Sequence, residues 1–86
     1  MTTENLKKRI EINPDVLVGK PVIKGTRISV EQIMRMLAAG MGESTILEQF
    51  PHLKKQDIQA AVLYGAELVK DMRAYPREFV GQIKIL

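Results

Sequence analysis

The side chains best suited to recognition chemistry in this 86-residue chain are cations and amides, and several of them cluster at residues 54–59. A lysine ammonium contacts phosphate or guanine, and a glutamine amide pairs with adenine through two hydrogen bonds. A glycine-bearing turn earlier in the chain carries two more cations. This combination predicts contact with a nucleic-acid duplex. The six DNA-binding candidates are Lys24, Arg27, Lys54, Lys55, Gln56 and Gln59.

Residues that support covalent catalysis are few. His52 is the only histidine, and it lies in an expected turn, where a solitary histidine is usually structural or solvated. The chain has no cysteine, which excludes disulfides and cysteine-based zinc sites. Gly19-Lys20 lacks the upstream glycine and the following Ser or Thr of a phosphate-binding loop. We therefore expect a protein that is not an enzyme, with no catalytic residue, metal or cofactor.

The charge of the chain is mildly basic and uneven, with a net charge of +3. Between residues 20 and 35, four cations stand against the single anion Glu31, which predicts a basic face. Glu43, Glu48 and Asp57 weaken such a surface nearby, and exposed Lys and Gln are also ordinary solvated residues.

A chain of this length forms only a small core of marginal stability, which favours a homodimer. Without a membrane-spanning run or a signal peptide, we expect a cytoplasmic protein that does not contact membranes.

The elements that must position these residues are short strands followed by helices. Residues 1–8 are expected as a flexible arm, and residues 9–12 alternate as a strand does. Residues 22–23 and 27–28 flank Lys24-Gly25-Thr26 and predict a β-hairpin. Ser29, with Gln32 three residues later, predicts the start of a helix that ends near residue 39. Two further helices are expected over residues 43–50 and 55–74.

The last helix is expected to face the core with one apolar stripe. The stripe consists of Ile58, Ala61, Val62, Gly65, Val69 and Met72. Leu63, Tyr64 and Leu68 lie off this stripe, and they either contact the hairpin or form a dimer interface.

The helices at 43–50 and 55–74, joined by a tight turn, match a helix-turn-helix, whose second helix reads the major groove.

The string INPDVLVGKPVIKGTRISVEQIMRML, followed by GESTILEQFPHLKKQDIQAAVLYGAEL, resembles the domain-of-unknown-function 433 family, and the resemblance covers residues 9–68. It implies a mainly α fold, in which a short β-strand and a β-hairpin precede a three-helix, homeodomain-like helix-turn-helix bundle. The family's members look like antitoxins of the VapB type that accompany a PIN-like ribonuclease toxin. The resemblance therefore implies neutralisation of such a toxin and repression of the shared promoter.

The expected elements and the resemblance together divide the chain into a flexible arm at 1–8, the family's domain at 9–75 and a C-terminal tail at 76–86. Where relatives often carry Thr or Ser, this chain has Lys54, which cannot accept the hydrogen bond of a helix cap. Arg27 has two interpretations: it binds phosphate, or it pairs with a carboxylate of its own domain.

A second interpretation of the function is an adaptor that uses the same dimeric fold to bind a protein, without specific DNA binding. The tail could then add a strand to the sheet edge of a partner, or pack on its own domain. The partner-binding candidates are Leu63, Tyr64, Ile83, Ile85 and Leu86.

Overall fold

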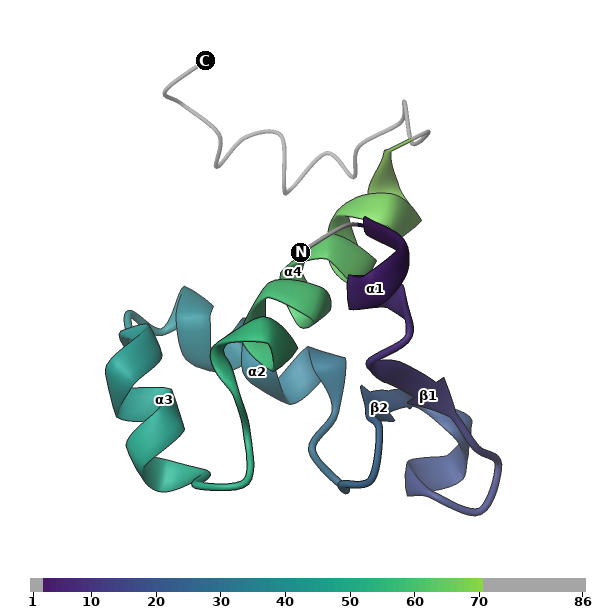
Figure 1. Ribbon diagram of the computed structural model, residues 1–86, viewed down its shortest axis with the longest axis horizontal. Helices are drawn as coiled ribbons and strands as arrows, with labels where there is room; N and C mark the ends of the chain where they lie inside the picture. Colours follow the sequence, from purple (N-terminus) through teal and green to yellow (C-terminus); the bar gives the residue numbers. More distant parts are fainter. Residues whose placement is uncertain (1–2, 71–86) are drawn as a thin grey trace, which may run out of the picture.

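The computed structural model describes residues 3–70, which form a small helical fold with a two-stranded sheet at one end (Figure 1). The elements are α1 (Thr3–Lys7), β1 (Ile10–Ile12), the 3-10 turn η1 (Leu17–Gly19), β2 (Pro21–Ile23), α2 (Val30–Ala38), α3 (Glu43–Gln49) and α4 (Lys55–Val69). The expected tail at 76–86, with Ile83, Ile85 and Leu86, lies outside the described residues, as do Met72 and the predicted helix end near residue 74. None of the helices within residues 3–70 has the length and apolar composition needed to cross a bilayer.

The sheet pairs strands that differ from those of the predicted hairpin. β1 runs antiparallel to β2, with Ile10 opposite Ile23. The expected second arm at residues 27–28 is not a strand, and it is followed by a single bridge between Val22 and Ser29. Within this turn, the Thr26 hydroxyl donates to the Ile23 carbonyl (2.8 Å) and accepts from the Ile28 amide (3.0 Å). The chain therefore turns directly into α2, and β1 takes the place of the pairing partner.

Residues 17–19 form a left-handed turn between the two strands. Leu17, Val18 and Gly19 have φ values of 49°, 56° and 79°. Leu17 and Val18 carry side chains, yet they share the left-handed backbone geometry that glycine adopts most readily. Left-handed geometry costs such residues roughly 1–2 kcal/mol each. The turn brings the chain back antiparallel, so that Pro21 begins β2 opposite Ile12.

Helices α2 and α3 begin and end close to their predicted bounds. The Ser29 hydroxyl accepts a hydrogen bond from the Gln32 amide at 2.9 Å, which confirms the predicted cap of α2. Gly40 has φ +92°, the left-handed geometry that ends a helix after its last turn. α3 stops before Pro51, because a residue that precedes proline avoids helical geometry.

The core lies where α2, α3 and α4 meet β2. Its buried residues are Ile23, Val30, Ile33, Ile46, Leu53, Ile58 and Ala61. The predicted stripe of α4 is partly wrong, since Val62 and Val69 are 45% and 55% exposed while Ala60 is buried. Small Ala60 and Ala61 let neighbouring elements approach α4 closely, so its inward face is turned away from Val62 and Val69.

The arm expected at residues 1–8 is largely a helix in the structure. α1 packs against α4, and Figure 1 shows the two side by side. No apolar periodicity predicts α1, because Leu6 is its only large apolar residue.

Candidate nucleic-acid interface

The candidate interface is centred on the first turn of α4. Lys54 is the residue before the helix, and its side chain has no acceptor atom with which to cap it. The cap comes instead from Asp57, whose Oδ2 accepts the backbone N–H of Lys54 at 2.8 Å. This carboxylate also complements the positive end of the helix dipole. The missing N-cap acceptor is thus offset by a carboxylate three residues into the helix.

Asp57 also ties α4 to the start of β1. Its Oδ1 accepts a hydrogen bond from Arg9 Nη1 at 2.9 Å, and its side chain is only 7% exposed. Arg9 Nε is buried without a hydrogen-bond partner among the described residues, so this guanidinium depends on Asp57 for its compensation. The sequence placed Asp57 in the first helical turn but did not identify Arg9, which lies 48 residues away. No local pattern marks such a pair.

The ion pair determines what the first turn of α4 presents to solvent. Lys54, Lys55 and Gln59 are exposed, and Gln56 is half-buried. The first-turn carboxylate points inward, where Arg9 neutralises it. The outward surface of this turn therefore combines two ammonium groups, amide side chains and the positive end of a helix dipole.

The two remaining DNA-binding candidates lie in the turn between β2 and α2. The Lys24 backbone N–H donates to the carbonyl of Arg9 at 2.8 Å, so this turn is connected through Arg9 to the start of α4. Lys24 and Arg27 are exposed, and neither forms an ion pair within residues 3–70. The pairing with a domain carboxylate that the sequence suggested for Arg27 is made by Arg9.

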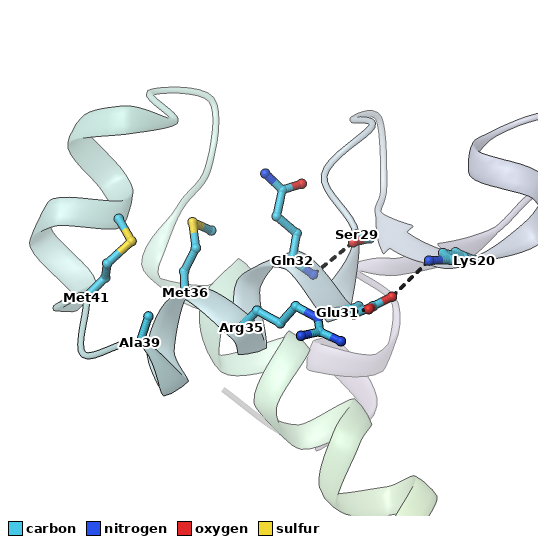
Figure 2. Close-up of a pocket in the computed structure, with 8 residues that line it drawn as sticks. All are labelled: Lys20, Ser29, Glu31, Gln32, Arg35, Met36, Ala39 and Met41. Atoms are coloured by element: carbon cyan, nitrogen blue, oxygen red, sulfur yellow. Dashed lines mark hydrogen bonds and ion pairs between the residues drawn. The ribbon is translucent and has the colours of Figure 1, made fainter.

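The basic face predicted for residues 20–35 is smaller than expected. Figure 2 shows Glu31 between Lys20 and Arg35, two of the four cations of this segment. Lys20 Nζ lies 2.9 Å from Glu31 Oε1, and Arg35 Nε lies 3.0 Å from Glu31 Oε2. The hydrogen bond from Lys20, followed by that from Arg35, lowers the pKa of Glu31 below its usual value. Lys20 and Arg35 also line an open hollow of about 450 Å³ above α2. Of the four cations in this segment, only Lys24 and Arg27 form no ion pair within residues 3–70.

The two partner-binding candidates on α4 line different surfaces. Leu63 lines a groove of about 480 Å³ together with Leu37, Ile58, Val62 and Gln59. Tyr64 lines two other grooves, one against α2 and one against β1. The structure therefore does not combine Leu63 and Tyr64 in one apolar patch.

Metal ligands do not gather in the part of the chain that the structure describes. No group of three His, Cys, Asp or Glu residues is placed there to hold an ion. His52 is exposed in the turn between α3 and α4.

Comparison with known proteins gives a consistent family relationship. A curated relative, the uncharacterized protein y4eO of Sinorhizobium fredii (strain NBRC 101917 / NGR234), is 38% identical over 53 residues, and the match covers 62% of this chain. The matched region spans only 24% of that relative. A crystal structure of a DUF433 member protein from Anabaena variabilis ATCC 29413 superposes with a TM-score of 0.70 at 28% identity. That superposition covers 78% of this chain and 66% of the other.

The family model described as "Protein of unknown function (DUF433)" matches residues 10–65, which extend from β1 into α4. That range includes both the glycine-bearing turns and the capped start of α4. The chain is a member of the DUF433 family.

Proposed function

We propose that this protein is a DNA-binding, antitoxin-like protein of a type II toxin–antitoxin system. It neutralises a PIN-like ribonuclease toxin and represses its own operon. In this role it is a cytoplasmic homodimer and not an enzyme. Each copy places the first turn of α4 in the major groove of the operator.

The observation that carries the DNA-binding role is the inward position of Asp57. A first-turn carboxylate on the outer surface would repel phosphate, but this one is 7% exposed and paired with Arg9. Lys54 and Lys55 then face solvent at the positive end of the helix dipole. Gln59, one turn further along, is exposed where a base edge would lie.

The arrangement of the helices supports a homeodomain-like helix-turn-helix. α3 ends at Gln49 and α4 begins at Lys55, with Leu53 of the connecting turn buried between them. α2 packs against α4 and supplies the third helix of the unit (Figure 1). Lys24 and Arg27 contact the phosphates that flank the groove in this arrangement.

The homodimer and the toxin rest on arguments separate from the groove contact. A two-fold repressor reads two half-sites about one helical turn apart, which requires a second copy. The exposed apolar side chain of Val62, two turns after the start of α4, offers area for binding a partner. The toxin partner is what the family resemblance of the sequence motif implies. The matched region spans about a quarter of the length of the curated relative, so the rest of that protein is not compared with this chain.

Fluorescence anisotropy tests DNA binding with two duplexes, one from the region upstream of its own gene and one of scrambled order. We expect the upstream duplex to bind more tightly, with an affinity that falls as salt rises from about 50 to 200 mM. Lys55→Gln should weaken binding to both duplexes and reduce the salt slope by about 1. Gln59→Ala should mainly reduce the preference between them, by about tenfold.

Lys70→Gln is the matched control, because it removes the same charge at the other end of α4. Lys70 pairs with Glu67 at 3.0 Å and lies far from the proposed groove contact. Its salt slope should equal that of the unmodified protein. Equal losses for Lys55→Gln and Lys70→Gln would reject a localised interface, and equal affinity for both duplexes would reject a repressor.

The adaptor is the second candidate, and the apolar groove around Leu63 favours it. Val62 is 45% exposed beside this groove, which suits a protein partner better than DNA. For an adaptor, both duplexes should bind equally weakly. Val62→Asp should then abolish co-purification with the product of the neighbouring gene and leave circular dichroism unchanged.

A further inference from the structure

The outer edge of β1 has no strand beside it within residues 3–70. Lys24 N–H donates to the Arg9 carbonyl, and hydrogen-bonded pairs alternate along an antiparallel ladder. Glu11 therefore directs its backbone groups toward Val22, whereas Ile10 and Ile12 direct theirs away from β2. The far side of β2 is already engaged, because the Ile23 amide donates to Ile28 at 2.9 Å. Within residues 3–70, the unpaired backbone donors and acceptors of the sheet are therefore those of β1.

An apolar groove of about 250 Å³ lies beside this edge. Ile10, Ile12, Tyr64 and Leu68 line it, with charged Lys7 and Glu67 also at its wall. Ile12 is 59% exposed and Leu68 is 65% exposed, both large fractions for aliphatic side chains in a domain of this size. A strand added to β1 would place every second side chain over these residues.

We propose that residues 82–86 of the same chain, Gln82-Ile83-Lys84-Ile85-Leu86, add to β1 as an antiparallel third strand. In this register Ile83 lies opposite Ile12, and Ile85 lies opposite Ile10. Lys84 then lies opposite Glu11. The sequences Ile10-Glu11-Ile12 and Ile83-Lys84-Ile85 have the same alternation and opposite central charges.

Charge favours this occupant over a second copy of β1. Two β1 strands paired about their centre would oppose Glu11 to Glu11, and directly opposed like charges destabilise a sheet. Lys84 instead gives Glu11 the counter-charge that it lacks within residues 3–70. Such cross-strand pairs of opposite charge stabilise antiparallel sheets.

The length of the intervening chain permits the contact. Twelve peptide steps separate Lys70, at the end of α4, from Gln82. An extended chain of that length spans about 40 Å. The longest dimension of the fold is 38 Å, and Leu68, near the end of α4, itself lines the groove.

This inference does not depend on DNA binding. It makes three of the partner-binding candidates contact one another, because Ile83 and Ile85 lie over Tyr64. A toxin that binds the tail must then first displace it from β1.

A charge-reversal cycle in the full-length protein tests the pairing. Amide exchange of Ile10 and Ile12 is measured in the unmodified protein, in Glu11→Lys, in Lys84→Glu and in the double variant. Each single reversal should speed exchange by about fivefold, and the double variant should restore slow exchange. Lys24→Glu, a reversal of an exposed cation beyond the end of β2, should leave both amides unchanged. Unaltered exchange in the single variants, or no restoration in the double variant, would overturn the proposal.

Cross-linking identifies which chain supplies the strand. The chain has no cysteine, and Glu11 and Lys84 would form a non-hydrogen-bonded pair with Cα atoms about 4.5 Å apart, within disulfide range. The Glu11→Cys/Lys84→Cys variant should oxidise to a cross-linked monomer at a rate independent of protein concentration. Lys24→Cys/Lys84→Cys should oxidise much more slowly. A cross-linked dimer would show that a second copy supplies the strand and would overturn the intrachain pairing, as would equal rates for the two variants.

Discussion

Helices α2 and α4 both begin after a residue in extended conformation, but they cap their first turns in opposite ways. At α2, the Ser29 hydroxyl accepts from the amide three residues later. At α4, the Asp57 carboxylate reaches back to the amide three residues earlier. These are the two halves of a capping box, each used alone. In α2 the capping group itself is an uncharged hydroxyl. In α4 it leaves the position before the helix free for a lysine.

The two caps also differ in what anchors them. Ser29 is buried next to the β2 bridge, and its hydrogen bond is local. Asp57 is held by Arg9, so the cap of α4 is at the same time a contact between the helix and the sheet. We conclude that α4 begins where the tertiary structure fixes it, whereas α2 begins where its own sequence fixes it.

Removing the anchored carboxylate should have the largest effect. Asp57→Ala deletes the cap and leaves the partly buried guanidinium of Arg9 without a counter-charge. We expect a loss of about 3 kcal/mol in the free energy of unfolding. For a chain of this size, that corresponds to a fall in melting temperature of about 10 °C or more. Thermal unfolding followed by circular dichroism measures it, and a fall of only 1–2 °C (about the size of a surface change) would contradict an anchoring role.

Removing the cation should cost less, because the carboxylate retains one backbone donor. We expect Arg9→Met to lower the free energy of unfolding by about 2 kcal/mol while it keeps apolar packing. In a double-mutant cycle with Asp57→Asn, the combined loss should be smaller than the sum by about 1 kcal/mol. Strict additivity in urea unfolding would mean that the two side chains act independently.

Local features of this fold could be predicted from the sequence, and long-range ones could not. Ser29 followed by Gln32 marks a helix start within four residues, so α2 was located correctly. The partner of Asp57 lies 48 residues away, and no periodicity connects it to Arg9. Pairing of strands is equally non-local, which is why residues 27–28, and not β1, were predicted as the pairing partner of β2.

The candidate interface follows the same division. Gln56 and Gln59 were both expected to be exposed, because they were placed opposite the Ile58 stripe of the helix. The structure has Gln59 exposed but Gln56 only half-buried. The pairing of Glu31 with Lys20 reduced the predicted basic face, and it joins elements separated in the chain. Val62 was placed inward because its residue type is apolar, but Ala60 and Ala61 determine which side of α4 packs most closely.

Ser29→Ala tests the local cap. The change removes one hydrogen bond at α2 and leaves the Arg9–Asp57 pair intact. We expect a loss of about 1 kcal/mol, clearly smaller than that of Asp57→Ala. Thr45→Ala, an exposed change within α3, serves as a control and should be close to neutral. A loss as large as that of Asp57→Ala would remove the distinction between a local and an anchored cap.

Lys54→Ser should have the smallest effect on stability, and it is a gain. The serine hydroxyl can accept from an amide of the first turn of α4, so that both halves of the capping box form at one helix. We expect the free energy of unfolding to rise by about 0.5–1 kcal/mol.

The same change, Lys54→Ser, removes a cation from the proposed groove contact, so DNA affinity should fall and the salt slope should decrease by about 1. Lys54→Ala provides the comparison, since it removes the charge without adding an acceptor and should weaken DNA binding without the gain. If Lys54→Ser raises stability and leaves DNA affinity unchanged, Lys54 does not contact phosphate, and its position before α4 requires another explanation.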